Sequence, residues 1–219
     1  MLAVFDLDDT LVDRSSAIRR WAQLLVGREG MSADAIGAIV GIDRDGAASR
    51  DEFLAVVHSL PGMRMTVTEL RNWYAGSYLS CYGVEDESIR ALTTLRAARW
   101  KIGVVTNGSQ ERTTEKLTHA GLAPLIDALC VAAEVGVPKP DRRIFDEVAR
   151  RCGVELSGWM IGDAPVEDIG GGAQAGLRTA WLRRGRRWDG EVPPPDIEAD
   201  SVLEAVATIL NADQRINTW

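Results

Sequence analysis

Four short stretches of the chain are almost continuously apolar, without the regular polar alternation of a half-buried strand. They are LAVF (2–5), KIGVV (101–105), GWMIG (158–162) and RTAWL (178–182). Apolar runs of this length are typical of strands that are covered on both faces, as in a parallel sheet. The pattern therefore predicts four buried, parallel strands.

Helical patterns lie between these strands. Residues 86–99 carry Ile89, Leu92 and Leu95 at helical spacing, and residues 110–121 and 141–153 each end in a glycine that suits a helix C-terminus. Strands that alternate with helices predict an α/β fold with a doubly wound, Rossmann-like parallel sheet. Ligands of such sheets bind beyond the carboxyl ends of the strands.

One long segment, residues 14–82, interrupts this alternation. It is mainly helical in pattern, over residues 15–30, 32–41, 49–60 and 67–83. We expect a small α-helical cap domain at 14–82, inserted just after the first strand of a catalytic core made of residues 1–13 and 83–219. The core is predicted to finish with the connection VPPPD (192–196) and a last helix over 199–210.

Composition and charge narrow the classes of partner. The chain has 219 residues, of which 46% are hydrophobic, and its net charge of -7 disfavours nucleic acid and anionic membranes as partners. Its three cysteines are widely spaced, no apolar run reaches the ~20 residues of a membrane span, and the first residues lack the basic start of a signal peptide. We expect a soluble, cytoplasmic protein, and its oligomeric state stays open.

Polar side chains follow three of the predicted strands, and another lies in a loop. They are Asp6, Asp8 and Asp9 after the first strand, Thr106 and Asn107 after the second, Lys139 in a loop between two prolines, and Asp163 and Asp168 after the third. Because the carboxyl ends of parallel strands share one edge, these groups should converge. Carboxylates together suit Mg²⁺, and backbone N–H groups that open a helix favour an anion.

The balance of charge indicates a phosphate ester as the substrate. Several carboxylates and a phosphate repel one another, and one Mg²⁺ and Lys139 bring the total near balance. An ionised carboxylate can attack phosphorus directly, and a second carboxyl beside it can act as acid and then as base. The residues therefore permit hydrolysis through an aspartyl-phosphate.

Four segments together resemble the haloacid dehalogenase (HAD) superfamily of hydrolases, in its phosphatase branch. They are DLDDT (6–10), VVTNG (104–108), VGVPKPD (135–141) and MIGDAPVEDIGGGAQAG (160–176), in the family's order and with its usual spacing. The resemblance covers the whole predicted sheet domain. One DxD pair alone would be weak, whereas four ordered motifs are specific.

The resemblance implies a role for each motif residue. Asp6 would be the nucleophile and a Mg²⁺ ligand, Asp8 the general acid and base with its backbone carbonyl on the metal, and Lys139 a counter-charge to both nucleophile and phosphoryl oxygens. Thr106 and the N–H of Asn107 would hold the phosphoryl group. Asp163 would ligate Mg²⁺, and Asp168 would ligate through water or orient the site. The substrate would be a small phosphorylated metabolite.

Three other functions stay open beside a phosphatase. The family's dehalogenases lack the second aspartate of the first motif, so the presence of Asp8 disfavours dehalogenation. A phosphomutase would use the same aspartyl-phosphate and return the phosphoryl group to a sugar. A non-catalytic binding domain on this scaffold usually loses one of the motif residues, and all are present here.

Several weaker patterns have plainer interpretations. GIDRDGAASRDEF (41–53) imitates a calcium loop but has Gly41 where an acid is needed, so we predict a turn with Ser49 capping the next helix. GGGAQA (170–175) is predicted to pack a helix closely on the sheet. RRGRRW (183–188) is interpreted as a solvated loop, with a phosphorylated polymer or protein partner as the alternative. Asp9 is predicted only to shape its turn.

Overall fold

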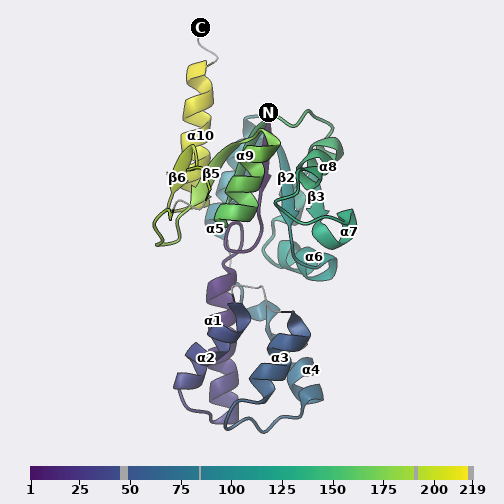
Figure 1. The fold of residues 1–219 in the computed structure, drawn as a ribbon, viewed down its shortest axis with the longest axis vertical. Coiled ribbons are helices and arrows are strands. Elements are labelled where there is room, and N and C mark those ends of the chain that lie inside the picture. Colours follow the sequence, from purple (N-terminus) through teal and green to yellow (C-terminus); the bar gives the residue numbers. More distant parts are fainter. Residues whose placement is uncertain (45–48, 84, 190–191, 217–219) are drawn as a thin grey trace. The chain divides into compact units, whose positions relative to one another are not determined.

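The chain folds as two compact units, each described here by itself. The structure is a computed structural model that describes residues 1–44, 49–83, 85–189 and 192–216. Met1–Val12 and Val84–Trp219 form one unit, the sheet unit, and Asp13–Gly83 form the other, the helical unit. Figure 1 gives their elements along the chain. That the helical unit acts as a cap stays a prediction.

The sheet unit is built on one parallel sheet, which confirms the predicted fold class. Six strands are seen in the described residues, in the order β3-β2-β1-β4-β5-β6. Their bounds are β1 Leu2–Phe5, β2 Lys101–Thr106, β3 Ala128–Val131, β4 Gly158–Gly162, β5 Arg178–Leu182 and β6 Ile197–Ala199. Val4 of β1 pairs with Gly103 on one side and Met160 on the other. The order in which the strands are added thus reverses between β1 and β4, and ligands of such folds bind at this switch point.

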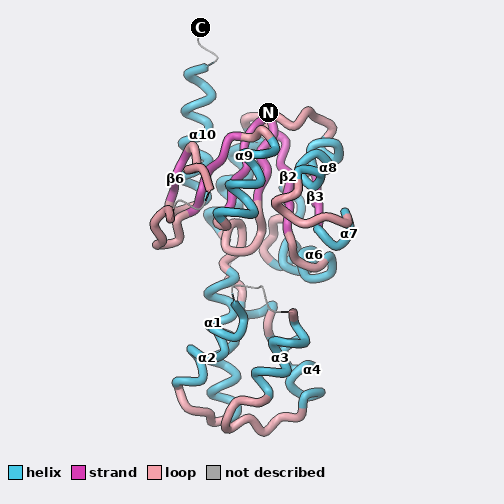
Figure 2. Tube along the Cα trace, in the orientation of Figure 1, coloured by secondary structure: helices cyan, strands magenta, loops and turns pink. Residues whose placement is uncertain are grey.

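Helices cover both faces of this sheet (Figure 2). They are α5 Asp86–Ala97, α6 Gln110–His119, α7 Ala132–Val135, α8 Arg142–Cys152, α9 Gly171–Ala175 and α10 Val202–Ile216, with short turns η3 Ala123–Leu125 and η4 Pro165–Gly170. α5 contacts β2 and α10, which also contacts β5, whereas α8 and α9 pack together against β1 to β5. The glycine-rich segment thus packs on the sheet as α9, as predicted.

The best-defined core lies between α8 and the sheet. Ile144, Phe145, Val148 and Cys152 are buried on one face of α8, at the spacing that the sequence indicated. The helix begins after Asp141, whose carboxylate accepts a hydrogen bond from the backbone of Arg143, and it ends at Gly153 in a left-handed conformation. No described helix combines the length and the apolar character needed to cross a bilayer.

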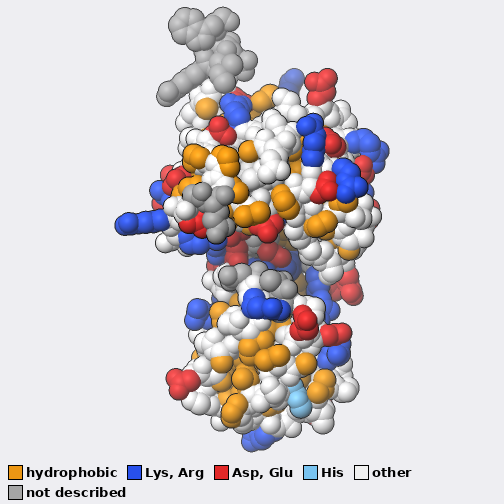
Figure 3. Space-filling view, viewed as in Figure 1, with side chains coloured by type: hydrophobic (Ala, Val, Ile, Leu, Met, Phe, Trp, Pro, Cys, Tyr) orange, Lys and Arg blue, Asp and Glu red, His pale blue; other side chains and the backbone are white. Residues whose placement is uncertain are grey.

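The helical unit packs around a cluster of aromatic rings. Its elements are α1 Arg14–Glu29, α2 Asp34–Asp43, α3 Arg50–His58, α4 Val67–Ser77 and the turn η2 Leu79–Cys81. Trp21 of α1 is fully buried, with its ring centroid 5.7 Å from that of Phe53 and 4.9 Å from that of Tyr74. Figure 3 shows hydrophobic side chains gathered on the visible face of this unit, and the surface of the sheet unit mixes both signs of charge.

The described residues of the segment that imitates a calcium loop belong to α2 and α3 or to the caps of these helices. Gly41 and Asp43 lie inside α2, and the Asp43 carboxylate pairs with Arg14 at 2.6 Å. Ser49 caps α3 in a capping box with Glu52, as predicted. Asp45, Gly46 and Ala48 of the same pattern lie outside the described residues. The helical position of Gly41 and the pairing of Asp43 with Arg14 therefore disfavour a calcium site.

Substitution of Gly103 tests the packing between β2 and α8. A methyl group at this position would lie 2.5 Å from Cγ2 of Val148, which is closer than packed atoms approach. We predict that Gly103→Ala lowers the free energy of unfolding by about 1–3 kcal/mol through overpacking. Urea denaturation checks this.

Val148→Ala supplies the matched control, because it removes the atom that the new methyl group would meet. The cost of Gly103→Ala should shrink in the double variant. Strictly additive costs would show that the close contact does not set the stability of this layer.

Candidate active site

The centre of the site is one buried lysine between two carboxylates. Lys139 Nζ donates to Asp6 Oδ1 at 2.5 Å and to Asp168 Oδ1 at 2.7 Å. Asp6 follows β1, its backbone N–H bonds to the carbonyl of Ile161 in β4, and Asp168 lies in η4 after β4. All three charged side chains are buried. Three distant segments therefore meet at the carboxyl edge of the sheet through one ammonium group.

Asn107 holds the backbone of Lys139 in place. Its side-chain Nδ2 donates to the carbonyl of Lys139 at 3.1 Å, and its Oδ1 accepts from the N–H of Lys139 at 2.8 Å. Thr106, at the end of β2, is buried, and its Oγ1 accepts from the N–H of Gly108 at 3.2 Å. The turn after β2 thus orders both itself and the loop that carries the lysine.

Three carboxylates can converge on a cation at this edge. One oxygen each from Asp6, Asp163 and Asp168 lie within 4.8 Å of one another. Asp168 is held by the N–H of Ala164 at 3.0 Å, and it fits only because Gly162 lacks a Cβ, which would lie 2.2 Å from its Oδ2. Hard oxygen donors in this number suit Mg²⁺, and the partial exposure of Asp163 leaves room for the waters that this ion keeps. The residues therefore fit the ion that the sequence predicts.

Burial dominates the electrostatics of these groups. Burial raises the pKa of Asp6 well above its usual range, although the charge of Lys139 opposes the effect. Burial, helped by the charges of Asp168 and Asp9, raises the pKa of Asp163 to about 7. Burial alone would lower the pKa of Lys139, but its two carboxylate partners outweigh that and raise it. The lysine thus stays charged, and the acids favour a cation beside them.

The structure adds three cations to the site that the sequence motifs do not contain. Lys116 of α6 pairs with Asp8, Arg184 lies 3.3 Å from Asp9, and Arg186 lies 2.9 Å from Asp163. Both arginines belong to the segment 183–188, which the sequence analysis interpreted as a solvated loop, with a phosphorylated polymer or protein partner as the alternative. The loop is exposed, but its guanidinium groups contact carboxylates of the site.

Asp9 shapes the turn after β1, in line with the sequence interpretation. Its backbone has a left-handed φ of 59° and its N–H bonds to the carbonyl of Val12 at 2.7 Å. Aspartate tolerates this conformation better than most residues do. Its carboxylate points to Arg184, and it is not one of the three convergent metal-ligand candidates.

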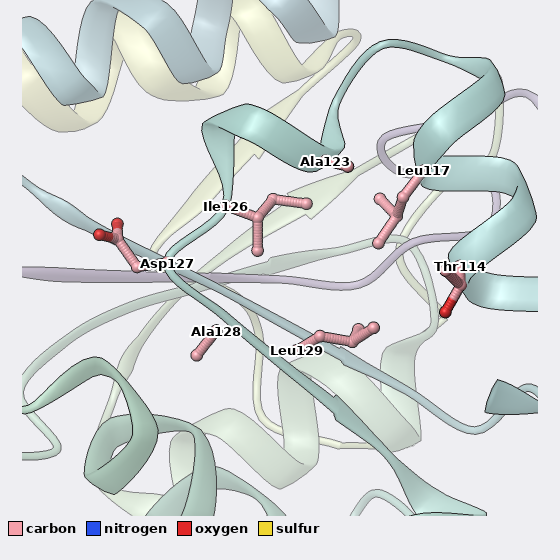
Figure 4. Close-up of a pocket in the computed structure, with 7 residues that line it drawn as sticks. All are labelled: Thr114, Leu117, Ala123, Ile126, Asp127, Ala128 and Leu129. Atoms are coloured by element: carbon pink, nitrogen blue, oxygen red, sulfur yellow. The ribbon is translucent and has the colours of Figure 1, made fainter.

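A separate apolar pocket is lined in part by residues of α6. It has a volume of about 200 Å³ and lies between α6, η3 and β3 (Figure 4). Thr114, Leu117 and Ile126 are among its lining residues, and none of the site carboxylates lines it. The chemistry therefore belongs to the sheet edge and not to this pocket.

Comparison with known proteins gives matches over most of the chain. Residues 3–182 match the family model of the haloacid dehalogenase-like hydrolases. The chain is 34% identical over 138 residues to the glyceraldehyde 3-phosphate phosphatase of Methanopyrus kandleri, a match that covers 61% of this chain and 58% of that protein. It is 36% identical over 118 residues to the pyrimidine 5′-nucleotidase YjjG of Escherichia coli, covering 52% of each. The chain thus spans little more than half the length of these two relatives.

A solved structure matches more completely. The magnesium-bound HAD-hydrolase YfnB of Bacillus subtilis superposes with a TM-score of 0.74 at 25% identity, covering 96% of this chain and 98% of that one. The agreement extends over both units of the chain. It places the carboxylate cluster in a fold that binds magnesium in that relative.

The raised pKa of Asp163 predicts how the metal-free protein responds to pH. The unfolded chain releases this proton near pH ~3.9, whereas the folded protein keeps it until about pH 7. Between these values the folded state binds more protons, so the free energy of unfolding falls as pH rises. The loss should approach about 4 kcal/mol by pH ~8.

Urea denaturation of metal-free wild type and of Asp163→Asn, at several pH values, isolates this contribution. The variant should lose less stability than wild type as pH rises, and Mg²⁺ should restore wild type most at the highest pH because it binds the ionised carboxylate. Parallel curves for the two proteins would contradict the assignment.

Proposed function

Because the chain belongs to the haloacid dehalogenase-like hydrolases, we propose that it is a Mg²⁺-dependent phosphatase that hydrolyses a small phosphomonoester through an aspartyl-phosphate. The observation that carries this proposal is the meeting of Asp6, Lys139 and the carboxylate cluster, with Asp8 two residues beyond Asp6. The two relatives named above are phosphatases of a triose phosphate and of a nucleotide. We propose the cytoplasm as the place of action.

In the first step, Asp6 is the nucleophile. One of its carboxylate oxygens forms a bond to phosphorus, the bond from phosphorus to the ester oxygen breaks, and Asp8 gives that oxygen its proton. Lys139 stabilises the ionised form of Asp6 and balances the phosphoryl charge. The N–H of Asn107 and the hydroxyl of Thr106 bind the other phosphoryl oxygens.

In the second step, Asp8 acts as a base. It takes a proton from water as the water oxygen attacks phosphorus, and the bond from phosphorus to Asp6 breaks. Free phosphate leaves and Asp6 returns as a carboxylate. Asp8 thus gives up one proton in the first step and regains another, from water, in the second.

Mg²⁺ would be held by the carboxylates of Asp6 and Asp163 and by the backbone carbonyl of Asp8. The carboxylate of Asp168 would bind it directly or through water. When bound, the ion supplies positive charge that neutralises the carboxylates and the phosphoryl oxygens. Because burial raises the pKa of Asp6, this charge also favours the ionised nucleophile. We therefore expect little turnover without the metal.

Substitution of the nucleophile tests the proposal. Asp6→Asn should abolish turnover of p-nitrophenyl phosphate, because the amide cannot form the acyl-phosphate, while circular dichroism shows an intact fold. Asp9→Asn is the matched control, since it makes the same change in the same loop and keeps a residue that tolerates the left-handed backbone. Full activity of Asp6→Asn would remove the nucleophile assignment.

A panel of phosphorylated metabolites separates the substrate classes. Triose phosphates, nucleoside monophosphates and phosphoserine, each assayed with Mg²⁺ and with EDTA, should show release of phosphate that depends on the metal. A hexose 1-phosphate belongs in the panel, because isomerised sugar instead of free phosphate would identify a phosphomutase. Absence of turnover on every member with Mg²⁺ would favour a non-catalytic domain.

A further inference from the structure

Lys116 occupies an unusual place on α6. Thr113, Lys116 and Leu117 form the buried stripe of this helix, at the i, i+3 and i+4 spacing that normally carries apolar residues. Only 10% of the Lys116 side chain is exposed. Burying an ammonium group is costly unless it is paired. A lysine that only kept the protein soluble would be exposed, so the burial of Lys116 indicates a specific role.

This lysine pairs with the carboxylate of Asp8. Lys116 Nζ lies 2.5 Å from Asp8 Oδ1 and 2.8 Å from Oδ2, so it contacts both oxygens. Two contacts restrict rotation of the carboxylate more than one does. The helix that carries Lys116 begins at Gln110, three residues after Asn107, so the turn proposed to bind the phosphoryl group leads directly into the helix that contacts Asp8.

We propose that Lys116 is a positioning residue that holds the Asp8 carboxyl in line with the reacting oxygen atoms. The inference rests on the proposed function, in which Asp8 must first protonate the leaving oxygen and then deprotonate water. Both oxygens occupy the position opposite Asp6, so one fixed orientation of Asp8 serves both transfers.

This assignment differs from that of Lys139. Lys139 bridges Asp6 and Asp168, on the side of the nucleophile and the metal, whereas Lys116 contacts the acid and base. Loss of Lys116 therefore leaves the nucleophile with its counter-charge. The expected defect is confined to proton transfer, and that is what separates a positioning role from a general loss of structure.

The test uses three variants of the full chain. Lys116→Met removes the charge and both contacts while keeping the length of the side chain, and Lys116→Arg retains a cation that can reach Asp8. Lys101→Met is the matched control, because Lys101 pairs with Asp127 at 2.9 Å and lies at the start of β2, away from the site. Thermal unfolding of each variant reports on the fold.

The first readout is the dependence of kcat/KM on the leaving group. Lys116→Met should lose only a few-fold with p-nitrophenyl phosphate, whose leaving group departs without a proton. It should lose about 100-fold with alkyl phosphates, which need the acid. Lys116→Arg should recover most of the loss with alkyl phosphates, and Lys101→Met should match wild type with both classes.

The second readout is the fraction of enzyme trapped as aspartyl-phosphate after acid quenching. With p-nitrophenyl phosphate this fraction should rise in Lys116→Met, because the step that needs Asp8 as a base slows more than the first step. KM for p-nitrophenyl phosphate should fall together with kcat, because slower breakdown of the aspartyl-phosphate lowers both, and kcat/KM should change only a few-fold.

The inference is overturned if Lys116→Met loses the same factor with every substrate, or if it behaves like Lys101→Met. If Lys116→Met does not fold, Lys116→Gln, which keeps a donor but no charge, is judged by the same two readouts. A wild type that forms no aspartyl-phosphate would instead reject the proposed function, so the two failures are distinguishable.

Discussion

The pairing of Lys139 with Asp6 and Asp168 is the interaction on which the site depends. Carboxylates that are buried side by side repel one another, and each would be neutral without a nearby positive charge. The ammonium group lies within hydrogen-bonding distance of both. Because the lysine comes from the loop before α8 and its two partners follow β1 and β4, the contact ties the chemistry to the correct assembly of the sheet.

The same constraint extends to the surrounding acids. Asp8, Asp9 and Asp163 each face a cation, namely Lys116, Arg184 and Arg186 in that order. Four cations thus face five carboxylates among the described residues of this edge. The remaining negative charge and the three convergent oxygens leave a place for a divalent ion and a phosphate, whose charges oppose each other. This edge therefore carries more carboxylates than cations among the described residues, which favours binding of a divalent ion.

Much of this arrangement could be predicted because it depends on short-range patterns. Apolar runs marked β1, β2, β4 and β5, and the polar residues after them had to meet at one edge. The pattern does not separate β3, because ALCV lies within a mostly apolar stretch, residues 122–137, that gives no clear start or end for a strand, and β6 is only three residues long. Their places became clear only from the parallel pairing with β2 and β5.

The second set of cations could not be predicted in the same way. Lys116 left one signal, a charged residue on the buried stripe of a helix, but its partner lies 108 residues away and no local pattern names it. Arg184 and Arg186 lie in the exposed loop that follows β5. Their contacts depend on the direction in which this loop leaves the sheet, and the spacing of residues in the sequence does not reveal that direction. Long-range ion pairs are a property of the assembled fold.

The most direct measurement is the location of the covalent phosphate. Enzyme mixed with a phosphomonoester and Mg²⁺, quenched in acid and digested, can be mapped by mass spectrometry. Phosphate on the carboxylate of Asp6, absent when EDTA replaces Mg²⁺, is the result that the site predicts. Rapid turnover without a covalent phosphate, or a phosphate on another residue, would contradict the central claim that Asp6 is the nucleophile of this hydrolase.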